Sequence, residues 1–116
     1  MGLAHELPIY KDVYKLILII FERTKNFPKE YKYTLGQDMK RDAICLVRSI
    51  YRANRNVDKK QYLEEFLDNF EILKLEFRLC VEFNLLTLSK QVLIIKLLDV
   101  IGKQATAWKN SQSSVR

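Results

Sequence analysis

The stretch DKKQYLEEFLDNFEILKLEFRLCVEF (58–83) contains no glycine or proline and repeats apolar residues at helical spacing. Side chains three and four positions apart share one face of an α-helix, so this pattern predicts one long amphipathic helix. Asp58 is a plausible N-cap for it. The residues expected on its apolar face are Leu63, Phe66, Leu67, Phe70, Leu73, Phe77, Cys80 and Val81.

Two further helical patterns precede this stretch. The first covers residues 9–25 and ends before Pro28, which disfavours helical geometry at the preceding residue; its apolar positions are Val13, Leu16, Ile17, Ile20 and Phe21, with Thr24. The second covers residues 35–54, and Thr34 with Gln37 has the spacing of a capping box. Its expected core stripe consists of Met39, Ala43, Leu46, Ile50 and Ala53.

The last helical pattern follows Thr87, a candidate N-cap, and reaches about Trp108. Its expected buried residues are Leu88, Val92, Ile95, Leu98, Ile101 and Ala105. Four long helices with short connections predict an all-α fold, an antiparallel up-down four-helix bundle. Residues 1–116 are expected to form a single domain, with residues 9–109 as the ordered core and flexible ends at 1–7 and 110–116.

The last two helical patterns carry more apolar residues than one stripe requires. The additional residues are Leu75, Leu79, Leu93, Ile94 and Leu97. A small bundle core cannot cover so wide an apolar face, so we expect the chain to form oligomers.

The charge is distributed unevenly. The net charge of the 116 residues is +6, with +7 on residues 23–60 and −4 on residues 61–82. This asymmetry favours polyanion binding, pairing of subunits, or both. No secretory signal precedes the first helix and no apolar run could span a membrane, so we expect a cytoplasmic protein in which Cys45 and Cys80 are reduced core thiols.

Residues for catalysis or metal binding are scarce. His5 is the single histidine, which argues against a zinc site, and the glycines are too isolated to form a phosphate-binding loop. Di-iron bundles require a histidine on each of two helices. We therefore expect no enzymatic activity, no metal and no cofactor.

The informative pattern lies between residues 41 and 55. Arg41, Arg48, Arg52 and Arg55 fall within an arc of roughly 60° on a helix, opposite the expected core stripe. Guanidinium groups bind phosphates bidentately, so this ridge is a candidate nucleic-acid site. Lysines could extend it: Lys59 and Lys60 follow it, and Lys29 and Lys32 precede it.

A structural interpretation of the same ridge remains open. Glu64, Glu65, Asp68 and Glu71 form an acidic ridge at comparable spacing on the next helix, so the two could pair within the chain or across subunits. Tyr31 and Tyr33 have a similar ambiguity, because they could stack on bases or cover one end of the bundle.

Three runs of sequence resemble a known family. These are NFPKEYKYTLGQDMKRDA (26–43), IYRAN (50–54) and IGKQATAW (101–108). They are similar to the four-helix accessory variability determinants of diversity-generating retroelements, a family that includes proteins encoded in intervening sequences of large-subunit ribosomal RNA genes. The resemblance covers roughly residues 8–109.

The resemblance implies a five-subunit ring with a basic surface that binds RNA or DNA and the reverse transcriptase of the retroelement. The candidate binding residues at matched positions are Lys29, Lys32, Lys40, Arg41, Arg48 and Arg52. Arg55 and Lys59 are candidates on charge alone. The alternative is an rRNA-insert protein that acts as a structural oligomerisation module and binds no nucleic acid.

Overall fold

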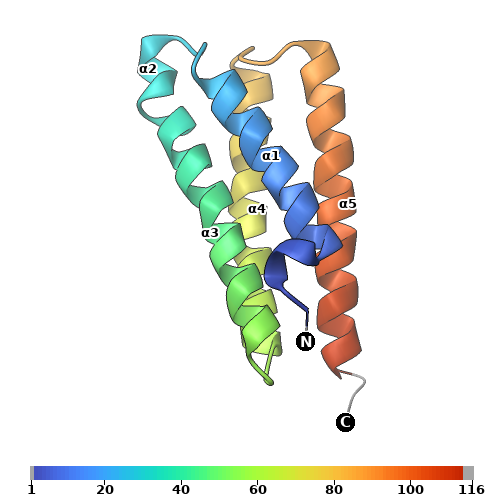
Figure 1. The fold of residues 1–116 in the computed structure, drawn as a ribbon. Coiled ribbons are helices and arrows are strands. Elements are labelled where there is room, and N and C mark those ends of the chain that lie inside the picture. Colours follow the sequence, from blue (N-terminus) through green and yellow to red (C-terminus); the bar gives the residue numbers. More distant parts are fainter. Residues whose placement is uncertain (1, 114–116) are drawn as a thin grey trace.

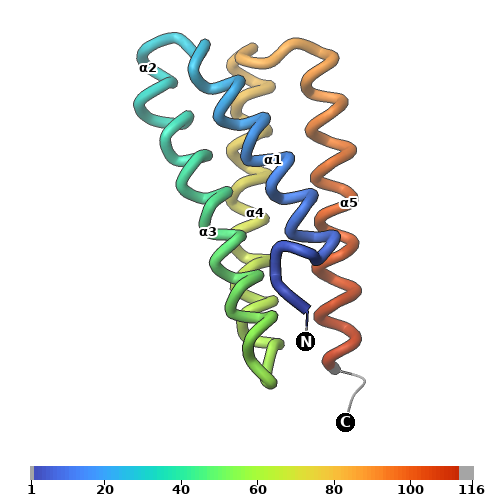
Figure 2. The backbone as a smooth tube through the Cα atoms, in the orientation of Figure 1, coloured from blue at the N-terminus to red at the C-terminus, as the bar shows by residue number. Residues whose placement is uncertain are grey.

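Four long helices run antiparallel along a common axis (Figure 1). In this computed structural model, which describes residues 2–113, the elements are the 3-10 helix η1 (Ala4–Glu6), α1 (Pro8–Thr24), α2 (Lys29–Lys32), α3 (Leu35–Arg55), α4 (Lys60–Glu82) and α5 (Leu88–Ser113). The α1–α3 and α4–α5 connections lie at one end of the bundle and the α3–α4 connection at the other (Figure 2). No strand occurs among the described residues, and the predicted up-down four-helix bundle is confirmed.

The core lies along the bundle axis, where each long helix contributes one buried stripe. All five residues expected on the α3 stripe are buried, from Met39 to Ala53. The expected stripes of α1 and α4 are largely correct, but Phe21 is 44 % exposed and Val81 is 40 % exposed. Both lie at the margin of the apolar arc, where the neighbouring helices cover them only in part.

The predicted buried face of α5 is wrong in its first half. Leu88, Val92 and Ile95 are exposed, whereas Ile94 is buried and continues the correctly predicted stripe of Leu98, Ile101 and Ala105. Apolar residues occur all around this part of the helix, so their spacing does not indicate which side faces the core. The helix continues to Ser113, into the segment expected to be flexible; residues 1 and 114–116 of that expectation lie outside the described residues.

The helix ends differ from two of the three capping predictions. The Thr34 hydroxyl donates to the carbonyl of Glu30 at 2.6 Å and makes no cap, because the one-turn helix α2 places that carbonyl beside it. Helix α4 begins at Lys60 rather than after Asp58. Thr87 does cap α5, since its hydroxyl oxygen accepts from the backbone N–H of Lys90 at 3.4 Å.

Both cysteines are free thiols, as expected. Cys80 is fully buried, and its sulfur lies 3.4 Å from the thioether sulfur of Met39 across the α3–α4 interface. Burial raises the pKa of the Cys80 thiol to about 12. Cys45 is only half-buried.

One turn before Cys80, the same interface contains a buried carboxyl group. Glu76 is 7 % exposed, and its Oε1 atom has no hydrogen-bond partner. Desolvation and a hydrogen bond with Asp42 of α3 raise the pKa of Glu76 to about 8. Burial and the neighbouring Asp42 carboxylate therefore both favour the protonated form of Glu76.

Candidate nucleic-acid interface

Helix α3 places the predicted arginine ridge on the outside of the bundle. The buried stripe of this helix packs against α1 and α4, which leaves the opposite face to solvent. Arg41, Arg48 and Arg55 are exposed and Arg52 is partly exposed. The four side chains share one side of α3, as their spacing predicts, but their ionic environments differ.

Two arginines of the ridge are paired with carboxylates. The Arg41 guanidinium lies 3.2 Å from Asp38 and 3.5 Å from Asp42, and these charges raise the pKa of Arg41. Arg52 reaches across to Glu65 of α4, with an N–O distance of 3.9 Å. The pairing that the sequence left open between the basic and acidic ridges thus occurs at Arg52.

Arg48 and Arg55 have no such neighbour. Within residues 2–113, no carboxylate lies within ion-pair distance of either guanidinium group. An exposed guanidinium without an internal counterion keeps all its N–H donors available for a phosphate. These two residues are therefore the part of the ridge best suited to bind a polyanion.

The lysine candidates divide between two places. Lys40 of α3 extends over the ring of Phe21 in α1, with its Nζ 5.4 Å from the ring centroid. Lys29 and Lys32 lie on α2 at the end of the bundle, away from Arg55 at the far end of α3 (Figure 1). The candidates thus spread along the length of α3 and do not gather at one point.

The two tyrosines near α2 have different surroundings. The Tyr31 ring stacks on Phe83 with centroids 5.1 Å apart, so Tyr31 covers the end of the bundle. Tyr33 is 58 % exposed, with the Lys32 ammonium 5.8 Å from its ring centroid. Stacking on bases is thus open to Tyr33 and largely blocked at Tyr31.

Lys59 has a structural environment. Its ammonium donates to the carbonyls of Ala53, Asn54 and Asn56, at 2.7, 3.3 and 2.6 Å. These carbonyls lie at the C-terminal end of α3, where the helix leaves acceptors unsatisfied and its dipole favours a cation. An ammonium group has three donors, so in this arrangement Lys59 holds the α3–α4 connection and has no donor left over for a phosphate.

Replacing Lys59 with methionine should lower the free energy of unfolding by about 1–3 kcal/mol, because charge-assisted hydrogen bonds to the α3 terminus are lost. Urea unfolding measures this, and Lys60→Met is the matched control, since Lys60 is exposed. The folded Lys59→Met variant should bind RNA as the unchanged protein does. An unchanged unfolding midpoint combined with weaker RNA binding would favour Lys59 as part of the candidate nucleic-acid interface.

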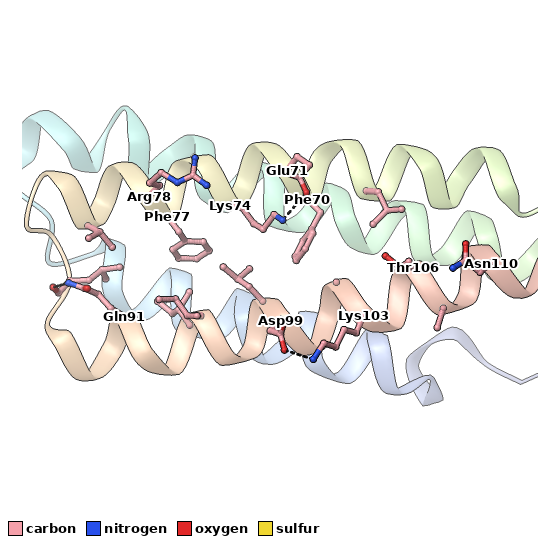
Figure 3. Close-up of a pocket in the computed structure, with 18 residues that line it drawn as sticks. Phe70, Glu71, Lys74, Phe77, Arg78, Gln91, Asp99, Lys103, Thr106 and Asn110 are labelled. Carbon is pink, nitrogen blue, oxygen red and sulfur yellow. Dashed lines mark hydrogen bonds and ion pairs between the residues drawn. The ribbon is translucent and has the colours of Figure 1, made fainter.

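Two apolar grooves flank α5. The larger, of about 830 Å³, runs between α4 and α5, and the rings of Phe70 and Phe77 point into it (Figure 3). The smaller, of about 470 Å³, lies between α1 and α5 and includes Leu18 and Leu93. Among the additional apolar residues that we expected to lie outside the core, Leu75 and Leu93 are exposed, whereas Ile94 is buried. The expected surplus of apolar surface is therefore present, mostly beside α5.

The described residues contain little that could hold a metal. Between residues 2 and 113, no three His, Cys, Asp or Glu side chains are grouped so that they could bind an ion. None of the helices in that part of the chain has the length and apolar character needed to cross a membrane.

A model of the family described as bAvd-like matches residues 7–112. The chain belongs to the bAvd-like family. This match confirms the resemblance to accessory variability determinants, which are accessory proteins of a non-catalytic kind. It includes α1, α3, α4, all but the last residue of α5, and every candidate binding residue. No curated protein matches the sequence.

The bAvd-like bundle also contains an aromatic cluster that the sequence analysis missed. Tyr10 of α1 lies between Tyr14, at 6.3 Å between ring centroids, and Tyr51 of α3, at 6.0 Å. Tyr51 follows Arg48 by three residues and precedes Arg55 by four, so it shares their side of α3. That spacing is visible in the sequence, but the packing of α1 against α3 is needed to bring the other two rings beside it.

Proposed function

We propose that this bAvd-like protein is a non-catalytic accessory protein of a diversity-generating retroelement. It binds RNA or DNA and the reverse transcriptase through the basic outer surface of α3, and in this way supports mutagenic retrohoming. The observation that carries the proposal is the exposure of Arg48 and Arg55, two guanidinium groups without a carboxylate partner among residues 2–113, on the outer face of a family member. In this proposal the reverse transcriptase carries out all the catalytic steps.

Assembly is the second part of the proposal. The exposed apolar residues beside α5 would face water in a monomer, and contiguous apolar surface of this kind marks interaction sites. We infer that other copies of the chain cover it, with five copies in a ring as the family resemblance implies. A ring would place several α3 faces on one particle, which increases the avidity for a long polyanion.

The nucleic-acid part of the proposal predicts unequal effects of paired substitutions. Arg48→Gln with Arg55→Gln should weaken RNA binding and reduce the slope of log affinity against log salt by about 0.7–0.9 for each lost phosphate contact. Arg41→Gln with Arg52→Gln removes the same charge and is the matched control. It should weaken binding less, because those guanidinium groups already have carboxylate partners.

The measurement is fluorescence anisotropy with labelled RNA over a salt series, accompanied by thermal melting of each variant. Neither double variant should change the melting temperature greatly, since exposed ion pairs contribute only about 0–1 kcal/mol. Equal losses of affinity in both variants would contradict a special role for Arg48 and Arg55 and indicate a diffuse charge effect.

A second candidate function is a structural oligomerisation module in which the ridge pairs with carboxylates of protein, as Arg52 does with Glu65 of the same subunit. This function predicts that wild-type protein binds no RNA or DNA even at low salt. Genomic position also separates the two: a reverse transcriptase gene with template and variable repeats beside this gene supports the retroelement function, and a position inside an rRNA gene supports the alternative.

A further inference from the structure

The tyrosine cluster defined by Tyr10, Tyr14 and Tyr51 forms an aromatic surface along the seam of α1 and α3. Tyr14 is 51 % exposed and Tyr51 is 45 % exposed, whereas Tyr10 is partly covered between them. The rings of Tyr10 and Tyr14 are nearly parallel, with an interplanar angle of 10°. The side chain of Tyr51 and burial raise the pKa of Tyr10. Each of the two outer rings therefore packs against Tyr10 on one side and leaves part of its surface to solvent.

Cations stand next to these rings. Arg48 and Arg55 lie one turn to either side of Tyr51 on α3, where side chains on the same face are about 5–6 Å apart at Cβ. Farther along the same seam, Lys40 covers Phe21, which lies two turns beyond Tyr14 on α1. Aromatic faces and positive charges thus alternate along one side of the bundle.

The carboxylates of α1 and α3 are engaged elsewhere. On α3, Asp38 and Asp42 pair with Arg41, and Asp42 also lies beside Glu76 of α4. On α1, Asp12 accepts a hydrogen bond from Gln104 of α5 at 2.7 Å, and Glu22 lies 3.2 Å from Lys25. No acidic side chain of the two helices therefore opposes a phosphate at the tyrosine cluster.

We propose that the tyrosine cluster is a binding site for single-stranded nucleic acid, with bases stacked on Tyr14 and Tyr51 and phosphates held by Arg48 and Arg55. This inference rests on the proposed function and specifies its ligand. A duplex hides the faces of its bases, whereas a single strand presents them, and every base can stack on an aromatic ring. The site should therefore distinguish single strands from duplexes with little preference for sequence.

The test compares Tyr14→Leu and Tyr51→Leu with the unchanged full-length protein. The probes are labelled oligouridylate, labelled oligothymidylate and a labelled DNA duplex of the same length. Fluorescence anisotropy measures the affinity of each variant for each probe. Each leucine substitution should weaken single-strand binding roughly tenfold, as expected for the loss of one stacked base, and leave duplex binding unchanged. Tyr51→Phe is the matched control, because it keeps the ring and should keep single-strand affinity near that of the wild type.

The other possible results separate a failure of this inference from a failure of the proposed function. Equal losses for single strands and duplexes, or losses in Tyr51→Phe as large as in Tyr51→Leu, would overturn stacking while leaving the proposed function in place. Unchanged affinities with a lower particle mass would show that the cluster contacts another protein chain, which also overturns the inference. A wild-type protein that binds none of the probes at low salt would refute the proposed function itself. Thermal melting of each variant verifies that it is folded.

Discussion

Replacing Glu76 with glutamine should raise the free energy of unfolding at about pH 8.5 by about 2–4 kcal/mol and change it little near pH 5. Glutamine has almost the shape of the glutamic acid side chain but cannot ionise. The variant therefore removes the cost of a buried negative charge and keeps most of the packing between α3 and α4.

The expectation follows from the position of the carboxyl group. Glu76 is buried, one of its oxygens has no hydrogen-bond partner, and Asp42 and Asp38 lie close enough to oppose a second negative charge. Desolvation and the Asp42 hydrogen bond outweigh the favourable charge of Arg41, so the pKa of Glu76 rises to about 8. An ordinary glutamate has a pKa of about 4.3 when the chain is unfolded.

The direction of the pH effect follows from these two values. Between them, the folded protein holds a proton on Glu76 that the unfolded chain has released, so folding is coupled to proton uptake. The stability of the wild-type protein should therefore fall as the pH rises from about 4.5 to 8 and level off above that range. In Glu76→Gln this component of the pH dependence should be absent.

Urea unfolding at several pH values measures the effect, and the difference between variant and wild type cancels the titration of all other groups. Glu82→Gln is a matched control on the same helix, because Glu82 is exposed. Parallel pH dependences in wild type and Glu76→Gln would mean that the carboxyl group ionises normally despite its burial.

Introducing glutamate at Ile95 should abolish the proposed assembly. Ile95 is 60 % exposed and lines the groove between α4 and α5, the larger of the two apolar grooves. If a neighbouring copy covers this groove, the substitution buries an unpaired carboxylate in an apolar contact, which costs several kcal/mol. Because the side chain is exposed within one subunit, the fold of the subunit should tolerate the change.

Light scattering provides the readout. The wild-type protein should have a multiple of the 13.8 kDa subunit mass, and Ile95→Glu should shift it to the monomer at micromolar concentration. Val57→Glu is the control, because Val57 is 95 % exposed and belongs to neither groove. A monomeric wild type would refute the proposed assembly, and an undiminished mass in Ile95→Glu would move the subunit contact away from this groove.

The parts of the fold that the sequence predicts well are those where polar residues bound the apolar stripe. On α3, every expected core residue from Met39 to Ala53 is buried because charged side chains occupy the opposite side. On α5, consecutive apolar residues made Ile94 and Ile95 equivalent in the pattern, and only packing against α1 and α4 decides between them. The Thr34 cap failed for a local reason, since the turn before α3 offered the hydroxyl a competing carbonyl.

The candidate site shows the same division. Helical spacing correctly placed Arg48 and Arg52 on the outer side of α3, but only the register between α3 and α4 brings Glu65 to Arg52 and leaves Arg48 without a carboxylate among the described residues. The charge of Lys59 suggested a ligand, but the spacing could not show that its ammonium donates to three carbonyls at the end of α3. Tertiary contacts therefore determine which charged side chains have a partner within the protein. The spacing of residues in the sequence does not reveal these contacts.

The unequal burial of the two cysteines makes the chain suitable for site-specific labelling. Maleimides react with thiolates, and the Cys80 thiol is fully buried, with a pKa of about 12, so it holds its proton. Cys45 is half-buried on α3, the helix that carries the arginine ridge. A fluorophore attached there would report on ligands that approach α3, and attachment of a second label would mark the moment at which the α3–α4 interface opens.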